Sequence, residues 1–168
     1  MARPDGGTTI IRFTKIVLAG LVALWGLFGL AGNLLKLDAA FAMVRATTSM
    51  PGFEPGAAPP WATDSALIAG LGVALIVLGK LLPAVLCSIG ALRMTSARNQ
   101  APEDWQRSKS LAIAGCGLAA AGLFLGWTVI GEFIFMMFRD PGLVQAADAA
   151  FRYGGFILLI GIFIAQRE

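Results

Sequence analysis

Four long apolar tracts constrain the fold of this chain more than any other feature of its sequence. A helix needs about 20 apolar residues to cross the hydrocarbon core of a bilayer. Charged residues make up 14% of the chain, whereas about 25% is typical of soluble domains. The sequence therefore predicts an all-α polytopic membrane protein that forms one domain, residues 1–168, with four transmembrane helices. The predicted spans cover residues 10–32, 66–92, 111–135 and 151–165.

The two longer connections between these tracts differ in composition. In the first, residues 33–65, apolar residues recur at roughly helical spacing from Leu37 to Met50, which predicts a short amphipathic helix at the membrane surface. The run 51–60 that follows is rich in proline and glycine and is incompatible with helix or strand. The other connection, residues 93–110, is polar and carries four basic residues. Neither connection leaves room for a second folded domain.

The basic residues predict the orientation of the chain in the membrane. Eight of the 13 lie at the N-terminus (Arg3, Arg12 and Lys15), in residues 93–110 or at the C-terminus, and four lie on the opposite side. Because Lys and Arg accumulate in cytoplasmic segments, we expect both termini and residues 93–110 to be cytoplasmic and residues 33–65 to form an outer loop. The basic residues are scattered rather than gathered on one face, so we expect no nucleic-acid partner.

The residues that usually carry chemistry are scarce. The chain has no histidine, which excludes His-bearing zinc, copper or iron sites within it and removes the commonest general base. The two cysteines, Cys87 and Cys116, lie at matching depth in apolar tracts, where a thiol usually packs as a small buried residue. We therefore expect no enzymatic activity, no catalytic residues, no cofactor and no metal site.

Small residues form the clearest packing signal. They share one stripe of the third span, where the last two form a GxxxG pattern: Gly115, Ala119, Gly122 and Gly126. Such stripes let membrane helices approach closely. We expect these residues to pack the four helices against one another, and recruitment of a partner helix is the alternative.

A second group of polar residues is expected at the outer boundary of the membrane. At 1.5 Å per residue, Asn33 and Glu132 each lie about 31 Å beyond the cytoplasmic start of their spans. Arg152 opens the last tract on the same side, which makes it a candidate partner for Glu132. We expect a hydrogen-bonded cap that fixes the helix positions. A site for a lipid headgroup or a quinone at the outer interface is the alternative.

Lys80 is the residue whose insertion into the membrane costs the most free energy. It lies 13 residues from both Leu67 and Arg93, close to the middle of the second span, where a charged lysine costs about 2.5–3.5 kcal/mol on insertion scales. Glu132 lies nearer to the outer face, so pairing of Lys80 within the chain is not expected. Three interpretations remain open: a neutral lysine in an apolar pocket, a lysine in a water-filled cavity, or a lysine paired with a carboxylate of a partner subunit.

Short motifs along nearly the whole chain resemble a family of bacterial predicted small integral membrane proteins that carry a domain of unknown function. They are Arg12-Phe-Thr-Lys15, Asn33, Cys87-Ser-Ile-Gly-Ala-Leu-Arg93, Gly131-Glu132-Phe133 and Ala149-Ala-Phe-Arg152. The resemblance implies four helices in a bacterial inner membrane and implies no established activity. The chain departs from it at Lys80, where the family is expected to carry a glutamate.

These observations favour a non-catalytic accessory or assembly subunit that packs on a larger inner-membrane complex. The costly Lys80, the small-residue stripes and the missing chemistry all favour this role. Its expected partners are the lipid bilayer and other membrane subunits. A small transporter or ion-translocating protein that uses Lys80 in a polar path is the alternative.

Overall fold

The computed structural model of the protein describes residues 6–54 and 56–168. Arg3 of the N-terminal basic group and Pro55 of the proline-rich run lie outside the described residues. Helices make up most of the described chain, and their bounds are α1 Gly6–Leu35, α2 Leu37–Ser49, α3 Ala66–Ala97, α4 Pro102–Ser108, α5 Ser110–Leu123, the π-helical segment η1 Phe124–Ile134, the 3₁₀ turn η2 Met137–Arg139 and α6 Pro141–Ala165.

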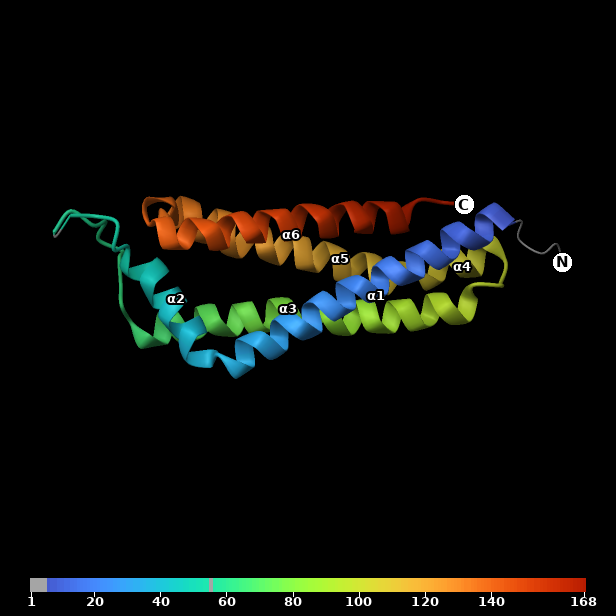
Figure 1. Ribbon diagram of the computed structural model, residues 1–168, viewed down its shortest axis with the longest axis horizontal. Helices are drawn as coiled ribbons and strands as arrows, with labels where there is room; N and C mark the ends of the chain where they lie inside the picture. The colour runs from blue at the N-terminus through green and yellow to red at the C-terminus, as the bar shows by residue number, and fades with distance from the viewer. Residues whose placement is uncertain (1–5, 55) are drawn as a thin grey trace.

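Four helices are long and apolar enough to cross a membrane: α1, α3, the continuous run from α4 through η1, and α6. The start of α1, the C-terminus and α4 lie at one end of the elongated bundle, and α2 lies at the other (Figure 1). The first will be called the terminal end and the second the α2 end. The predicted all-α fold with four spans, and the predicted short helix between the first two, are confirmed.

The half of the bundle nearer to the terminal end is tightly packed. Successive spans pair along their length, α1 with α3, α3 with α5, and α5 with α6. Small residues permit this approach: a Cβ on Gly90 would lie 2.5 Å from the Ala112 backbone nitrogen, and one on Gly161 would lie 2.9 Å from Cys116 Cβ. The main buried core lies here and includes Ala19, Val22, Met94, Ala112, Cys116 and Ile164.

Towards the α2 end, the α1–α3 pair and the α5–α6 pair separate (Figure 1). Helix α2 packs on the first part of α3, where Val44 contacts Gly72 so closely that a Cβ on this glycine would lie 2.6 Å from Val44 Cγ1. The α2 helix ends at Ser49, and its C-cap residue Met50 adopts the left-handed conformation with φ 54°. The bundle is therefore closed at one end and splayed at the other.

Two helices differ from the sequence prediction. Helix α6 begins at Pro141, ten residues before the predicted apolar span. Asp140 caps it by accepting a hydrogen bond from the Gly142 N–H at 2.7 Å, and proline is well suited to the first helical position. In the third span, residues 124–134 form a π-helix that ends with a hydrogen bond from Phe135 N to Ile130 O. Such segments are rare and frequently occur at functional sites.

Candidate functional site

A cavity of about 300 Å³ lies where the bundle splays, between α2, α3 and the third span. We call it the outer cavity. Met43, Val44, Thr47 and Thr48 of α2 line it at the α2 end, and Lys80 is the lining residue of α3 nearest to the terminal end. Apart from Lys80 and the two threonines, its lining is almost wholly apolar. The one cation that the sequence places in mid-span therefore borders an apolar space.

The predicted glycine stripe divides at this cavity. Gly115 and Ala119 pack as expected, since a Cβ on Gly115 would lie 2.5 Å from Cys87 Sγ and Ala119 is 1% exposed. Gly122 and Gly126 line the cavity, and a Cβ on either would meet nothing within 4 Å. These two glycines therefore do not lie in a close helix contact within the described chain, because α3 and the third span have already diverged at their level; their recruitment of a partner helix stays a prediction. They leave space instead.

Lys80 lies against helix α1. Its Nζ is 3.4 Å from the centre of the Trp25 ring, which is a cation–π contact. The lysine stem passes Gly29, where a Cβ would lie 3.2 Å from Lys80 Cδ. Within residues 6–54 and 56–168, no carboxylate pairs with Lys80. Sequence reasoning missed Trp25 as its aromatic contact, because the pairing depends on how α1 and α3 pack.

The predicted cluster at the outer boundary is not assembled. Glu132 is half-buried and Arg152 is exposed, and no ion pair joins them in the described part of the chain. Asn33 joins neither of them by a hydrogen bond there. The early start of α6 explains why Arg152 does not pair with Glu132: Arg152 lies 11 residues, or about 16 Å, inside that helix rather than at its beginning. Its neighbour Tyr153 lies 6.1 Å from Trp25, at the level of Lys80.

The two cysteines lie close together in the closed half of the bundle. Both side chains are 0% exposed, both thiols are free, and both residues belong to the main buried core. Cys87 Sγ also lies 3.7 Å from the Ala112 carbonyl oxygen. Both thiols thus lie in the closed half of the bundle as packed core residues.

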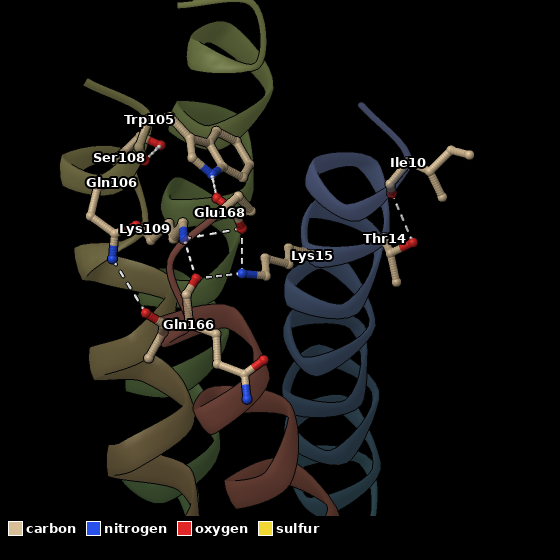
Figure 2. Close-up of polar contacts among 10 residues, drawn as sticks. Ile10, Thr14, Lys15, Trp105, Gln106, Ser108, Lys109, Gln166 and Glu168 are labelled. Carbon is tan, nitrogen blue, oxygen red and sulfur yellow. Dashed lines mark hydrogen bonds and ion pairs between the residues drawn. The ribbon is translucent and has the colours of Figure 1, made fainter. Parts of the chain in front are cut away.

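A buried polar cluster at the terminal end was not predicted from the sequence. We call it the inner cluster, and it consists of Arg12, Lys15, Trp105, Lys109 and Glu168. Glu168 accepts hydrogen bonds from Trp105 Nε1 and Lys109 Nζ and forms an ion pair with Lys15 (Figure 2). The three cations are 3%, 1% and 0% exposed. Sequence reasoning counted them only as topology signals, although Arg12 and Lys15 are spaced to share one helix face.

The inner cluster caps helix ends. Lys15 Nζ and Lys109 Nζ donate to the Gln166 carbonyl oxygen, just after α6, at 2.6 Å and 2.8 Å. Arg12 donates to the carbonyl oxygens of Arg98 and Gln100, just after α3. Cations are stabilising at the C-terminal ends of helices, where carbonyl groups lack partners. The cluster therefore fastens α1, α3 and α6 together.

The environment of Glu168 also sets its protonation. Burial of this carboxylate would raise its pKa, but hydrogen bonds from Lys15 and Trp105 and the positive charge of Lys109 lower the pKa below its ordinary value. Glu168 is thus held in its charged form, which matches its three donors.

A family model described as "Predicted small integral membrane protein (DUF2165)" matches residues 11–167. The chain belongs to this family. The match confirms the resemblance inferred from the short motifs, and it shows a small integral membrane protein of unknown function. No curated protein and no solved structure matches the chain.

The two sites of this family member differ in what they can do chemically. The charged groups of the inner cluster are paired with one another and with carbonyl groups of the same chain, so the cluster serves to hold the helices together. The outer cavity is open space beside a cation. No group of three or more His, Cys, Asp or Glu side chains able to hold a metal occurs among the residues described. The outer cavity with Lys80 is therefore the candidate functional site.

Proposed function

We propose that the chain is a non-catalytic accessory or assembly subunit that packs on a larger complex in a bacterial inner membrane. The observation that carries this proposal is the environment of Lys80, whose Nζ contacts the Trp25 ring and has no carboxylate partner among the described residues. A π face offsets only part of the cost of a cation in a membrane. The rest of the compensation comes from outside the chain.

The shape of the bundle supports the same proposal. The half nearer to the terminal end is closed by packed small residues and by the inner cluster, whereas the outer cavity remains open beside Lys80. Natural interiors are normally filled to high density. A bundle that packs tightly in one half and leaves a cavity in the other is well suited to binding other components of a complex at that cavity.

The proposal places both termini in the cytoplasm. The terminal end carries most of the basic residues, including Arg93, Arg98 and Arg107, which are exposed around the inner cluster. Accumulation of Lys and Arg marks the cytoplasmic side of a membrane protein. In this orientation α2 and the outer cavity lie towards the opposite side of the inner membrane.

The test is affinity purification from native membranes in a mild detergent. Wild type is expected to retain a stoichiometric partner, and Lys80→Met is expected to lose it. Lys36→Met is the matched control, because Lys36 is an exposed lysine between α1 and α2 that does not line the outer cavity. Recovery of wild type solely as a monomer or self-oligomer, with Lys80→Met behaving identically, would contradict the proposal.

A second candidate is a small transporter or ion-translocating protein. One observation favours it: the outer cavity runs from α2 at one end of the bundle to Lys80 in mid-span, as half of a path would. The apolar lining weighs against conduction of hydrophilic ions. Flux across proteoliposomes that disappears in Lys80→Met would support this candidate, and flux that is unchanged would remove the assigned path.

A further inference from the structure

We infer that the outer cavity binds a lipophilic molecule that carries a negatively charged oxygen, with this oxygen held by Lys80 and the apolar part enclosed between α2, α3 and the third span. The inference rests on the proposed function in one respect, that the compensation of Lys80 comes from outside the chain. It goes beyond that function by naming the chemistry of the compensating group.

The dimensions of the cavity favour a small molecule over a partner helix. Its volume of about 300 Å³ lies at the lower end of the range of ligand pockets, about 300–1,000 Å³. Helix α2 lines the cavity at the α2 end, and Val44 is pressed onto Gly72 of α3. A transmembrane helix, about 10–12 Å across, does not fit within this volume. One hydrocarbon chain or one ring system needs no such space.

The entrance favours a molecule that arrives from the bilayer. Leu71 and Leu75 line the cavity and are also 61% and 45% exposed, which places them at its rim on the outside of the bundle. On a membrane-spanning helix such exposed leucines face lipid. A ligand that enters past them is dissolved in the membrane.

The charge of Lys80 determines the polar part of the ligand. Among the described residues, Lys80 is the only charged one that lines the cavity, and it contacts the Trp25 ring without a carboxylate partner. An oxyanion next to an ammonium group forms a charge-assisted hydrogen bond and removes the cost of an uncompensated charge. A long-chain carboxylate combines such an oxygen with an apolar chain.

The glycines of the third span provide the space for the chain. Gly122 and Gly126 line the cavity, and a side chain on either would enter open space rather than strike a neighbour. Gly126→Leu is therefore expected to fold and to fill the cavity. Gly117→Leu is the matched control, because Gly117 is exposed on the same span, also has open space at its Cβ position and does not line the cavity.

The experiment uses the full-length protein in nanodiscs of phosphatidylcholine. Palmitic acid bearing a diazirine is the probe, and its uncharged methyl ester is the comparison; crosslinked positions are located by mass spectrometry. We expect labelling at cavity residues in wild type and Lys80→Arg. We expect about tenfold weaker labelling with the ester or in Lys80→Met, the effect of losing one hydrogen bond to a charged group. Gly126→Leu is expected to abolish labelling and Gly117→Leu to retain it.

Equal labelling by acid and ester, equal labelling of wild type and Lys80→Met, or labelling confined to exposed helix faces would overturn the inference. So would a carbodiimide crosslink in native membranes between Lys80 and a carboxylate of another protein, a result that would leave the accessory-subunit function standing. The opposite result is labelling of the cavity in a protein that purifies without a partner. It would support the ligand site and contradict the accessory-subunit function.

Discussion

At the terminal end, Lys15 and Lys109 are 1% and 0% exposed, and each donates to the Gln166 carbonyl and pairs with Glu168. In mid-span, Lys80 borders open space and contacts the Trp25 ring without a carboxylate partner in the described residues. The same residue type is thus fully compensated in one half of the bundle and only partly in the other. The contrast teaches that the inner cluster compensates its own buried charges, whereas the described chain offers Lys80 only an aromatic ring.

The largest expected effect comes from breaking the inner cluster. Glu168→Ala leaves the buried Lys15 and Lys109 without a carboxylate, and loss of one partner of a buried ion pair typically costs about 3–5 kcal/mol. We expect a loss of stability of about this size, measured by unfolding in detergent micelles. Glu103→Ala removes an exposed carboxylate near the same end and serves as the control. If both variants lose equally little stability, the inner cluster does not stabilise the fold.

Glycine replacements compare the packing of the two halves. Gly90→Ala places a methyl group 2.5 Å from the Ala112 backbone nitrogen, and such overpacking costs about 1–3 kcal/mol. Gly122→Ala meets nothing within 4 Å and gains up to about 1 kcal/mol from higher helix propensity. Opposite shifts in thermal stability are therefore expected, and equal destabilisation would show that the outer cavity is closed in the membrane.

Lysine-to-methionine variants provide a comparison with opposite signs. Lys15→Met is expected to destabilise the isolated protein, because it removes one of the two lysines that pair with the Glu168 side chain. Lys80→Met removes a mid-span charge that costs about 2.5–3.5 kcal/mol and loses a cation–π contact of about 2 kcal/mol. The isolated Lys80→Met protein should therefore be more stable by about 1 kcal/mol in thermal unfolding. Destabilisation by Lys80→Met would mean that the chain already compensates this lysine.

The smallest effect is the pH dependence of the inner cluster. The pKa of Glu168 is lowered in the folded protein from its ordinary value of 4.5, so the unfolded chain binds this proton more tightly. The stability contributed by Glu168 is then fully present above about pH 4.5 and is lost as the pH falls through the lowered value. Unfolding measured from pH 6 to pH 3 should show this loss in wild type and not in Glu168→Gln, and identical slopes would contradict it.

The sequence predicts the parts of this fold that depend on tract length and local periodicity. The four spans follow from apolar length, and α2 follows from the spacing of apolar residues between Leu37 and Met50. The start of α6 was missed because residues 141–150 are less apolar than a span, although Asp140 and Pro141 are a recognisable helix start.

The candidate site was only partly predictable. The position and cost of Lys80 follow from its place in an apolar tract. The outer cavity does not, because it depends on the angle between α3 and the third span, and the same angle makes Gly122 and Gly126 line a space rather than a helix contact. The inner cluster also joins residues more than 80 positions apart, such as Arg12 and Arg98, which no local pattern connects.

Native mass spectrometry of the protein released directly from its own membranes tests the central claim, that a group outside the chain compensates the charge of Lys80. Wild type and the control Lys36→Met are predicted to carry an additional bound mass, either a lipophilic anion or a partner subunit, and Lys80→Met is predicted to lack it. Identical spectra of wild type and Lys80→Met, each showing the bare chain, would contradict the account.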